Sequence, residues 1–274
     1  MVSVTSRILP LISSRERFAR RRTLSLAAKH AVFTYIPKNA CTTLRYSIAL
    51  ANGRAEDEET RVYLHSGMSE MLASHTDLAN NTYAFVMLRC PYRRIASAFL
   101  DKAVNEDSVV PPLFLPKLRV FRQSKFYSTD EAIAGAQAKA MALTFTTFLA
   151  LLQRRGTSRL DPHFRPQSNF LLRQGYNDYF ALENLTGAET SLKEKLDLRL
   201  VDLSGHGVRW RKRSDVDASS LTIADLIELR AAGYAPTYES LFTDAARRAV
   251  EVFYAADLAL YKKHFGSKGL LFPS

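Results

Sequence analysis

Cysteine is scarce in this sequence, which has only Cys41 and Cys90 among its 274 residues. Two cysteines in a chain of this length do not make the disulfide framework that stabilises small secreted domains. They indicate a reducing compartment, and we therefore expect a cytoplasmic protein.

Long apolar runs are also missing. No stretch approaches the ~20 apolar residues that a membrane-spanning helix needs, so we expect no membrane span. The apolar run at residues 8–12 contains Pro10 and is too short for the ~7–15-residue core of a secretory signal. We interpret residues 1–30 as a basic N-terminal extension and residues 31–274 as one globular domain.

Acidic residues are outnumbered, with 27 Asp and Glu against 38 Lys and Arg and a net charge of +11. A basic chain commonly binds nucleic acid. Here the charge is dispersed, and no zinc-finger spacing or RNA-binding aromatic signature occurs, so we expect no nucleic-acid partner. A positive field also suits a polyanionic cofactor. A basic, non-enzymatic nucleic-acid-binding protein stays open as an alternative.

Several catalytic motifs are absent. The sequence has no HExxH or CxxC, and its six histidines are scattered, so we expect no metal site. The serine-hydrolase elbow GxSxG and the nucleotide-binding loop GxxxxGK[ST] are missing as well. A small-molecule kinase remains an alternative, although it needs a magnesium-binding hydroxyl directly after its lysine, which this chain lacks.

The stretch around which the chain is organised is AVFTYIPKNACTTLRYSI, residues 31–48. Its first six residues predict a buried strand, and a helix is expected to start near Thr42 after a short turn. Free amides and the dipole at a helix start favour an anion. The turn adds the cation Lys38 and the hydroxyls of Thr42 and Thr43, so we predict a site for a phosphate-like group.

Residues 83–99, YAFVMLRCPYRRIASAF, repeat this arrangement. An apolar strand at 83–88 leads to Arg89, and Pro91 stands where a helix would start, a favoured position for proline. Two strand-to-helix anion sites in one chain indicate a ligand with phosphate-like groups at both ends.

The remaining elements complete an α/β pattern. We predict helices at 128–155, with a capping box at Ser128 and Glu131, at 187–196, at 221–232 and at 243–264, and a strand at 179–182. Strands that alternate with helices indicate a parallel sheet covered on both faces.

At this point the sequence resembles a known family. IPKNACTT (36–43) is similar to the 5′-phosphosulfate-binding loop of sulfotransferases that use 3′-phosphoadenosine 5′-phosphosulfate (PAPS), and LRCPYRRIASAF (88–99) to their 3′-phosphate segment, RDPxxRxxSxF. DPHFRPQ (161–167) and YFALENL (179–185) resemble the carbohydrate (family 2) members. The resemblance implies a P-loop-like three-layer sandwich with a central parallel sheet. One departure is Cys90, which stands where the family usually has aspartate.

The resemblance also implies roles for particular residues. Lys38 would contact the transferring sulfonate, and Arg89 and Ser97 would bind the 3′-phosphate. The acceptor would be a hydroxyl of a glycan or glycolipid, with 3′-phosphoadenosine 5′-phosphate (PAP) as the other product. The predicted cofactor-binding residues are Pro37, Lys38, Asn39, Ala40, Cys41, Thr42, Thr43, Arg89, Ser97, Arg213 and Ser214. Glu183 also matches a family glutamate.

The two cysteines lie in the two predicted phosphate-binding turns. Turn amides and basic neighbours lower the pKa of a thiol and raise its reactivity, so we expect both thiols to be reactive. Inert, buried cysteines are the alternative.

The general base is the last prediction from the sequence. An acceptor hydroxyl needs a residue that takes its proton, and histidine suits this role near neutral pH. His65 lies between the two phosphate motifs, where sulfotransferases commonly place their base, and LHSGMSEM (64–71) faintly resembles a segment of heparan sulfate 6-O-sulfotransferases. His163, in DPHFRPQ, is the second candidate, with a structural role as its alternative.

We therefore expect His65→Ala to lower kcat by ~10²–10⁴-fold, the contribution typical of general-base catalysis, and to leave PAP binding intact. Steady-state kinetics and PAP titration of the variant measure the two effects. A near-normal kcat in His65→Ala together with a loss in His163→Ala would transfer the role to His163.

Overall fold

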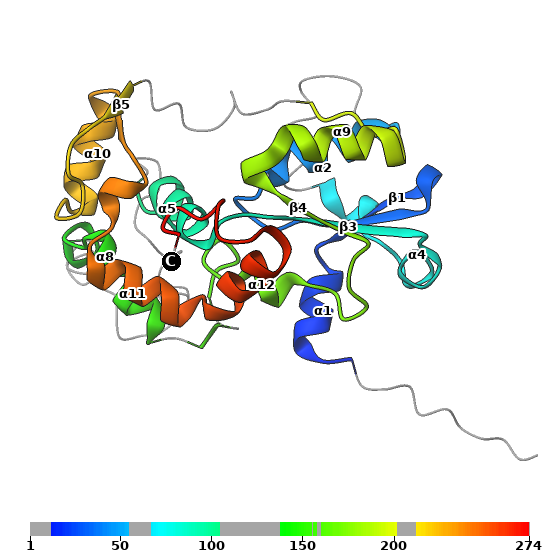
Figure 1. The fold of residues 1–274 in the computed structure, drawn as a ribbon, viewed down its shortest axis with the longest axis horizontal. Coiled ribbons are helices and arrows are strands. Elements are labelled where there is room, and N and C mark those ends of the chain that lie inside the picture. The colour runs from blue at the N-terminus through cyan, green and yellow to red at the C-terminus, as the bar shows by residue number, and fades with distance from the viewer. Residues whose placement is uncertain are drawn as a thin grey trace, which may run out of the picture.

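The computed structural model describes residues 12–54, 67–104, 138–154, 156–157, 160–201 and 212–273. His65 and the capping box predicted at Ser128 and Glu131 lie outside these residues. The described chain is built around a four-stranded sheet of order β1-β2-β3-β4 (Figure 1). Its strands are β1 (Thr23–Leu26), β2 (Ala31–Thr34), β3 (Tyr83–Leu88) and β4 (Asp178–Ala181).

Strands β2, β3 and β4 are parallel, as predicted, whereas β1 pairs with β2 in the antiparallel direction. All residues of β2 are buried, as are all those of β3 after Tyr83. Continuous rather than alternating burial is typical of parallel strands covered on both faces. Strand β1 lies within the segment that we interpreted as an extension.

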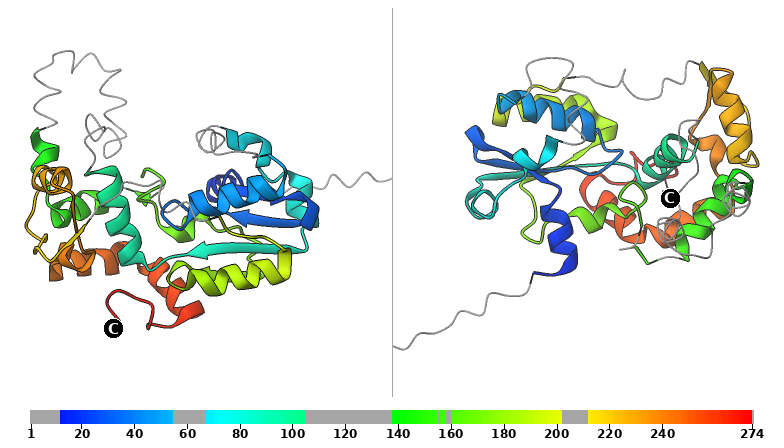
Figure 2. Two further views of the ribbon diagram at one scale, coloured as in Figure 1. Left: turned by 90° about the horizontal axis from the view of Figure 1, so that it is seen from above. Right: turned by 180° about the vertical axis from the view of Figure 1, so that it is seen from behind.

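Helices cover both faces of the sheet (Figures 1 and 2). On one face, α2 (Cys41–Ala51) and α9 (Leu185–Leu196) pack on Phe33 and Phe85. On the other, α5 (Pro91–Lys102) and α12 (Ala255–Phe265) pack on Val86 and Leu88. This arrangement confirms the predicted three-layer α/β sandwich.

A second group of helices lies on the far side of α5 from the sheet (Figure 2). It contains α8 (Phe145–Gln153), α10 (Ile223–Ala231) and α11 (Asp244–Phe253). Helix α10 connects β5 (Lys212–Ser214) to β6 (Tyr234–Pro236), which form a small parallel sheet of their own. The other described elements are α1 (Ser14–Arg20), α4 (His75–Asn80) and the 3₁₀ turns η1 (Ala27–Lys29), η2 (Gly67–Met71), η4 (Gln167–Phe170), η5 (Leu182–Asn184) and η7 (Glu239–Leu241). Among the described residues, no helix has the length and apolar character needed to cross a membrane.

Two predicted helices are interrupted. The helix expected at 243–264 is two helices that meet at Tyr254, whose hydroxyl donates a 2.6 Å hydrogen bond to the carbonyl of Phe164. In the described part of the helix expected at 128–155, α8 starts only after Thr144, whose side chain caps it in a capping box with Thr147. In both cases a side-chain hydrogen bond fixes where one helix ends or the next begins, although the apolar pattern continues through that position.

The centre of the sheet depends on aromatic packing between neighbouring strands. Phe85 is fully buried, stacks on Phe33 with 5.0 Å between ring centroids, and meets the edge of Phe180 at 6.2 Å. We expect Phe85→Ala to lower the free energy of unfolding by about 3–5 kcal/mol, the usual effect of emptying a buried aromatic site. Urea unfolding measures this change. Val252→Ala is the control, because Val252 is 74% exposed, and similar losses in the two variants would contradict the prediction.

Candidate active site

The two turns predicted to bind phosphate lie side by side at one edge of the sheet. Strands β2 and β3 are parallel neighbours, with Thr34 opposite Val86, so their carboxyl ends meet at the same edge. The first turn leads into α2 at Cys41, and the second leads into α5 with Pro91 at its first position, as expected. Ligands of open α/β sheets bind at this edge.

The first turn adopts a backbone conformation that non-glycine residues rarely take. Lys38 and Ala40 have φ values of 72° and 52°. A left-handed conformation costs a non-glycine residue about 1–3 kcal/mol and persists only where the surroundings enforce it. It places Ala40 directly before α2, whose first amides have no partner within the helix.

Three hydrogen bonds between this turn and the β3–α5 segment hold it in place. The side-chain amide of Asn39 donates to the carbonyl of Met87 at 2.8 Å. Arg89 Nη1 donates to the carbonyl of Lys38 at 2.9 Å, and Arg94 Nε donates to that of Pro37 at 3.1 Å. The two turns are therefore held together as one rigid unit.

Gln167 joins both turns from a third segment. Its Oε1 accepts hydrogen bonds from Asn39 Nδ2 at 2.6 Å and from the Arg89 amide at 3.0 Å, and its Nε2 donates to the Arg89 carbonyl at 2.8 Å. Asn39 is fully buried here, so its side chain positions the turn. Sequence reasoning did not assign Gln167 a role, although it ends the DPHFRPQ segment.

Arg94 is a buried cation beneath the site. Besides Pro37, its guanidinium donates to the carbonyls of Arg165 at 2.9 Å and of Pro162 at 3.2 Å. Burial lowers the pKa of Arg94, and the nearby Asp257 acts in the opposite direction. The Asp257 carboxylate accepts the amides of Gln167 at 2.6 Å and Ser168 at 2.9 Å. Arg94 is the second arginine of the RDPxxRxxSxF pattern. Its hydrogen bonds to backbone carbonyls hold two segments of the chain together.

The side chain of Lys38 is paired with an acid that the sequence analysis missed. Lys38 Nζ lies 3.3 Å from Asp101 Oδ2, and Lys102 Nζ lies 3.1 Å from the same oxygen. Burial alone would raise the pKa of Asp101, but the charges of Lys38 and Lys102 outweigh burial and lower it, so the carboxylate stays ionised. Asp101 follows Ser97 by four residues on α5, a spacing that puts both on one face.

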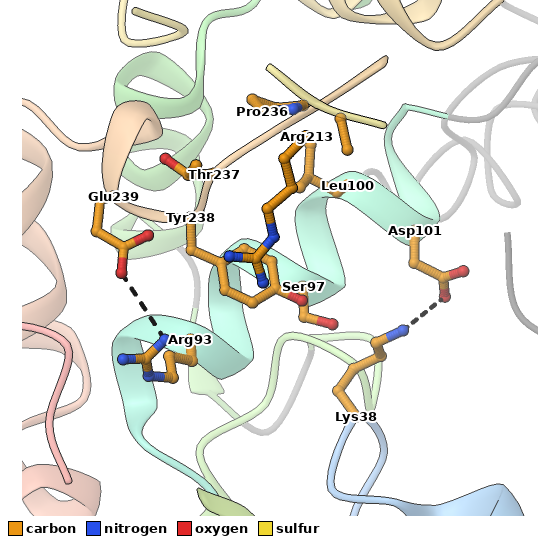
Figure 3. A pocket seen from close by; sticks show the side chains of 11 residues that line it. Lys38, Arg93, Ser97, Leu100, Asp101, Arg213, Pro236, Thr237, Tyr238 and Glu239 are labelled. Atoms are coloured by element: carbon orange, nitrogen blue, oxygen red, sulfur yellow. Dashed lines mark ion pairs between the residues drawn. The ribbon is translucent and has the colours of Figure 1, made fainter. Parts of the chain in front are cut away.

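A cavity of about 360 Å³ opens between these elements (Figure 3). The predicted residues Lys38, Ser97 and Arg213 line it, and so do Asp101 and Tyr238. Arg213 reaches the cavity because β5 pairs with β6, with Arg213 opposite Ala235. The size falls in the range of small-molecule sites, ~300–1,000 Å³.

Further charged groups surround this cavity. Arg93 lines it and lies 3.8 Å from Glu239. Arg89 Nη2 donates a 3.3 Å hydrogen bond to the Tyr238 hydroxyl. The arrangement presents several cations to one small volume, which favours a compact polyanion.

Not every predicted ligand lies on this cavity. Cys41, Thr42 and Thr43 are partly buried at the start of α2. Ser214 Oγ accepts the Val216 amide at 3.2 Å and thus closes a local turn.

His163 lies in the segment that Arg94 anchors, next to its own acid. Its Nδ1 is 2.7 Å from Asp161 Oδ1, and its amide donates to the same oxygen at 2.9 Å. Burial raises the pKa of Asp161, but the hydrogen bonds and charge of His163, with Lys102, outweigh this effect and lower it. His163 is not among the residues that line the cavity.

Comparison with known proteins adds the decisive observation. Residues 23–264 match the sequence profile of the Sulfotransferase family, so the match contains both turns and most of the chain. The chain belongs to the sulfotransferase family. No curated protein and no solved structure gives a significant match. The resemblance noted in the sequence is thereby confirmed, and the general chemistry of the chain is sulfuryl transfer.

In this sulfotransferase, the expectation for one of the two cysteines is wrong. Cys90 is fully buried, its Sγ accepts the Leu271 amide at 3.2 Å, and burial raises the pKa of its thiol. Glu183 supplies a carboxylate at this helix start instead. Its Oε1 accepts the Cys90 amide at 2.9 Å, and Tyr261 donates to its Oε2 at 2.9 Å. Negative charge here is favourable because it faces the positive end of the α5 dipole.

The two thiols should consequently differ in reactivity. Cys41 is partly exposed and Cys90 is not, so we expect one thiol of the native protein to react with Ellman's reagent and the second to react only after unfolding. The Cys41→Ser variant should show no fast-reacting thiol. Equal reaction rates for both cysteines in the native state would contradict the assignment.

Proposed function

We propose that this sulfotransferase moves the sulfuryl group of PAPS to a hydroxyl of a carbohydrate-like acceptor. The observation that carries the proposal is the cavity at the joined carboxyl ends of β2 and β3, where Lys38, Ser97 and Arg213 face one small volume. Two helix starts open beside it, at Cys41 and Pro91. A donor with phosphate groups at both ends of a nucleoside fits this pair of anion sites.

Each of the two turns would bind one end of the donor. The first amides of α2, with Thr42 and Thr43, would hold the 5′-phosphate, and Arg89 and Ser97 would hold the 3′-phosphate. Arginine suits the latter role because its guanidinium matches phosphate oxygens with paired N–H donors. The rigid contacts of the turn mean that these donors are in place before the ligand arrives, which is the condition for effective electrostatic stabilisation.

Lys38 would neutralise negative charge at the transferring group. Its ammonium group is held by Asp101, so it is fixed at the cavity wall rather than free in solvent. PAPS supplies an activated sulfuryl group: the bond from sulfur to the phosphate oxygen breaks as the bond to the acceptor oxygen forms. Charge builds up on the leaving oxygen during such a transfer, and a fixed cation there lowers the barrier.

The acceptor proton needs a base, and the geometry supports His163 as a candidate. The contact between His163 Nδ1 and Asp161 leaves Nε2 available to accept a proton, and the carboxylate stabilises the imidazolium that forms. Pro162, next to His163, is tied through Arg94 to the same turn that carries Lys38. His65 stays the first prediction from the sequence.

The acceptor is proposed to be a hydroxyl of a glycan or glycolipid, and the location to be cytoplasmic. The net charge of +11 favours an acceptor that is itself acidic, because opposite charge raises the encounter rate.

A thermal-shift titration with PAP and AMP tests the proposed function. At 100 times its Kd, a ligand that binds only the native state should raise Tm by roughly 5–10 °C for a chain of this size. We expect PAP to produce this shift and AMP to produce much less. Arg89→Ala should weaken the response to PAP far more than Lys38→Ala does, since Lys38 acts mainly at the sulfonate.

Arg173→Ala is the matched control, because Arg173 is exposed. Arg89→Ala also removes the hydrogen bond to the Lys38 carbonyl, and a disordered turn would weaken PAP binding by itself. Arg89→Lys keeps the positive charge at this position and is the control for that effect. Equal shifts with PAP and AMP in the unmodified protein would remove the 3′-phosphate assignment.

A further inference from the structure

Tyr238 occupies a position between the two side chains proposed to bind the 3′-phosphate. Arg89 Nη2 lies 3.3 Å from the Tyr238 hydroxyl oxygen, and Ser97 forms a side-chain hydrogen bond to the same hydroxyl. The Arg89 guanidinium carbon lies 5.5 Å from the centroid of the Tyr238 ring. Figure 3 draws Tyr238 among the side chains that line the cavity, with Ser97 and Arg213 near it in this view.

The contacts of Tyr238 fix its oxygen as an acceptor but do not fix the direction of its own proton. An arginine can only donate, so the Tyr238 oxygen accepts the Arg89 hydrogen bond. The phenol keeps its own proton, which it can donate to the Ser97 hydroxyl or to a ligand. Within the described parts of the chain, no carboxylate or carbonyl takes that proton. Tyr238 lines the cavity, so a bound anion can accept it.

The electrostatic field at this hydroxyl is positive. Burial raises the pKa of the Tyr238 phenol, but the charge of Arg89, the hydrogen bonds from Ser97 and Arg89, and the charge of Lys38 together outweigh burial and lower it. Arg93 and Arg213 line the same cavity, and Glu239 offsets part of their charge. A group that stabilises negative charge on a phenol oxygen also stabilises a phosphate oxygen at the same place.

Local structure holds Tyr238 in this position. It lies two residues after the end of β6 and directly before η7. In this turn the Ser240 amide donates a hydrogen bond to Thr237 Oγ1 at 3.2 Å, and the Ser240 hydroxyl donates one to the Thr237 carbonyl at 3.1 Å. Leu241 anchors the turn because its side chain is fully buried. The hydroxyl is therefore presented by a rigid element, as binding groups usually are.

We propose that Tyr238 is a third ligand of the anion that Arg89 and Ser97 hold, and that it donates its hydroxyl proton to that anion. In the context of the proposed function, on which this inference rests, the anion is the 3′-phosphate. Tyr238 then contributes to the preference for a nucleotide that carries this phosphate. Removing the hydroxyl weakens binding of such a nucleotide and leaves the binding of one without it unchanged.

Isothermal titration of PAP and of AMP tests this assignment in three proteins: the unmodified chain, Tyr238→Phe and Tyr234→Phe. Phenylalanine keeps the ring beside Arg89 and removes only the hydroxyl. A hydrogen bond to a charged group is worth about a tenfold change in Kd or more. We expect Tyr238→Phe to raise the Kd for PAP by this factor and to leave the Kd for AMP within about twofold. Tyr234 precedes Tyr238 by four residues and is 41% exposed, so its variant should bind both nucleotides normally.

A purely structural tyrosine would give a different pattern. Equal weakening of PAP and AMP, with a lower Tm in the absence of ligand, would mean that the hydroxyl only supports the fold and would overturn the inference. Tighter PAP binding by Tyr238→Phe would mean that the hydroxyl competes for the phosphate position, and unchanged PAP binding would mean that it is no ligand. In these cases the proposed function survives. Failure of the unmodified protein to bind PAP would instead remove the proposed function and this inference together.

Discussion

The guanidinium of Arg94 is the contact on which the rest of the site depends. It is buried, and it donates to carbonyls of Pro37, Pro162 and Arg165, which belong to two distant segments of the chain. A buried charge costs several kcal/mol unless hydrogen bonds and an opposite charge compensate for it, so this cation stabilises only the arrangement in which all three carbonyls converge. That arrangement brings the β2–α2 turn, the start of α5 and the His163 segment together. The strained φ values of Lys38 and Ala40 persist because this network holds them.

Carboxylates lie close to two of the cations that line the cavity. Lys38 is paired with Asp101, and Arg93 lies within reach of Glu239. These pairs keep flexible cationic side chains at defined positions before a ligand binds, which reduces the entropy lost on binding. They also limit the repulsion between neighbouring cations. A sulfotransferase moves a charged sulfuryl group, and a site whose cations are fixed in advance suits that task.

Much of the local structure could be predicted from the sequence. Strand β3 and the starts of α2 and α5 fall within about one residue of their predicted positions, because each is specified by neighbours in the chain: a run of apolar residues, a turn, and Pro91 at a helix start. The predictions were wrong at positions whose structure depends on contacts with residues far away in the sequence. The continuous helix expected at 243–264 breaks at Tyr254, which bonds to Phe164, and the thiol of Cys90 is buried where a reactive one was expected.

The sequence by itself determined the two strand-to-helix turns, their cations Lys38 and Arg89, and the family, because these features are contiguous in the chain. Only the tertiary structure decided which side chains face the cavity and which support it. Arg89 meets the hydroxyl of Tyr238, 149 positions away, and Asn39 meets Gln167, 128 positions away. No local pattern specifies such pairs, since hydrogen-bond geometry depends on how whole elements pack. The buried side chain of Asn39 therefore holds the turn in place, whereas Tyr238 lines the cavity and comes from a segment with no recognisable motif.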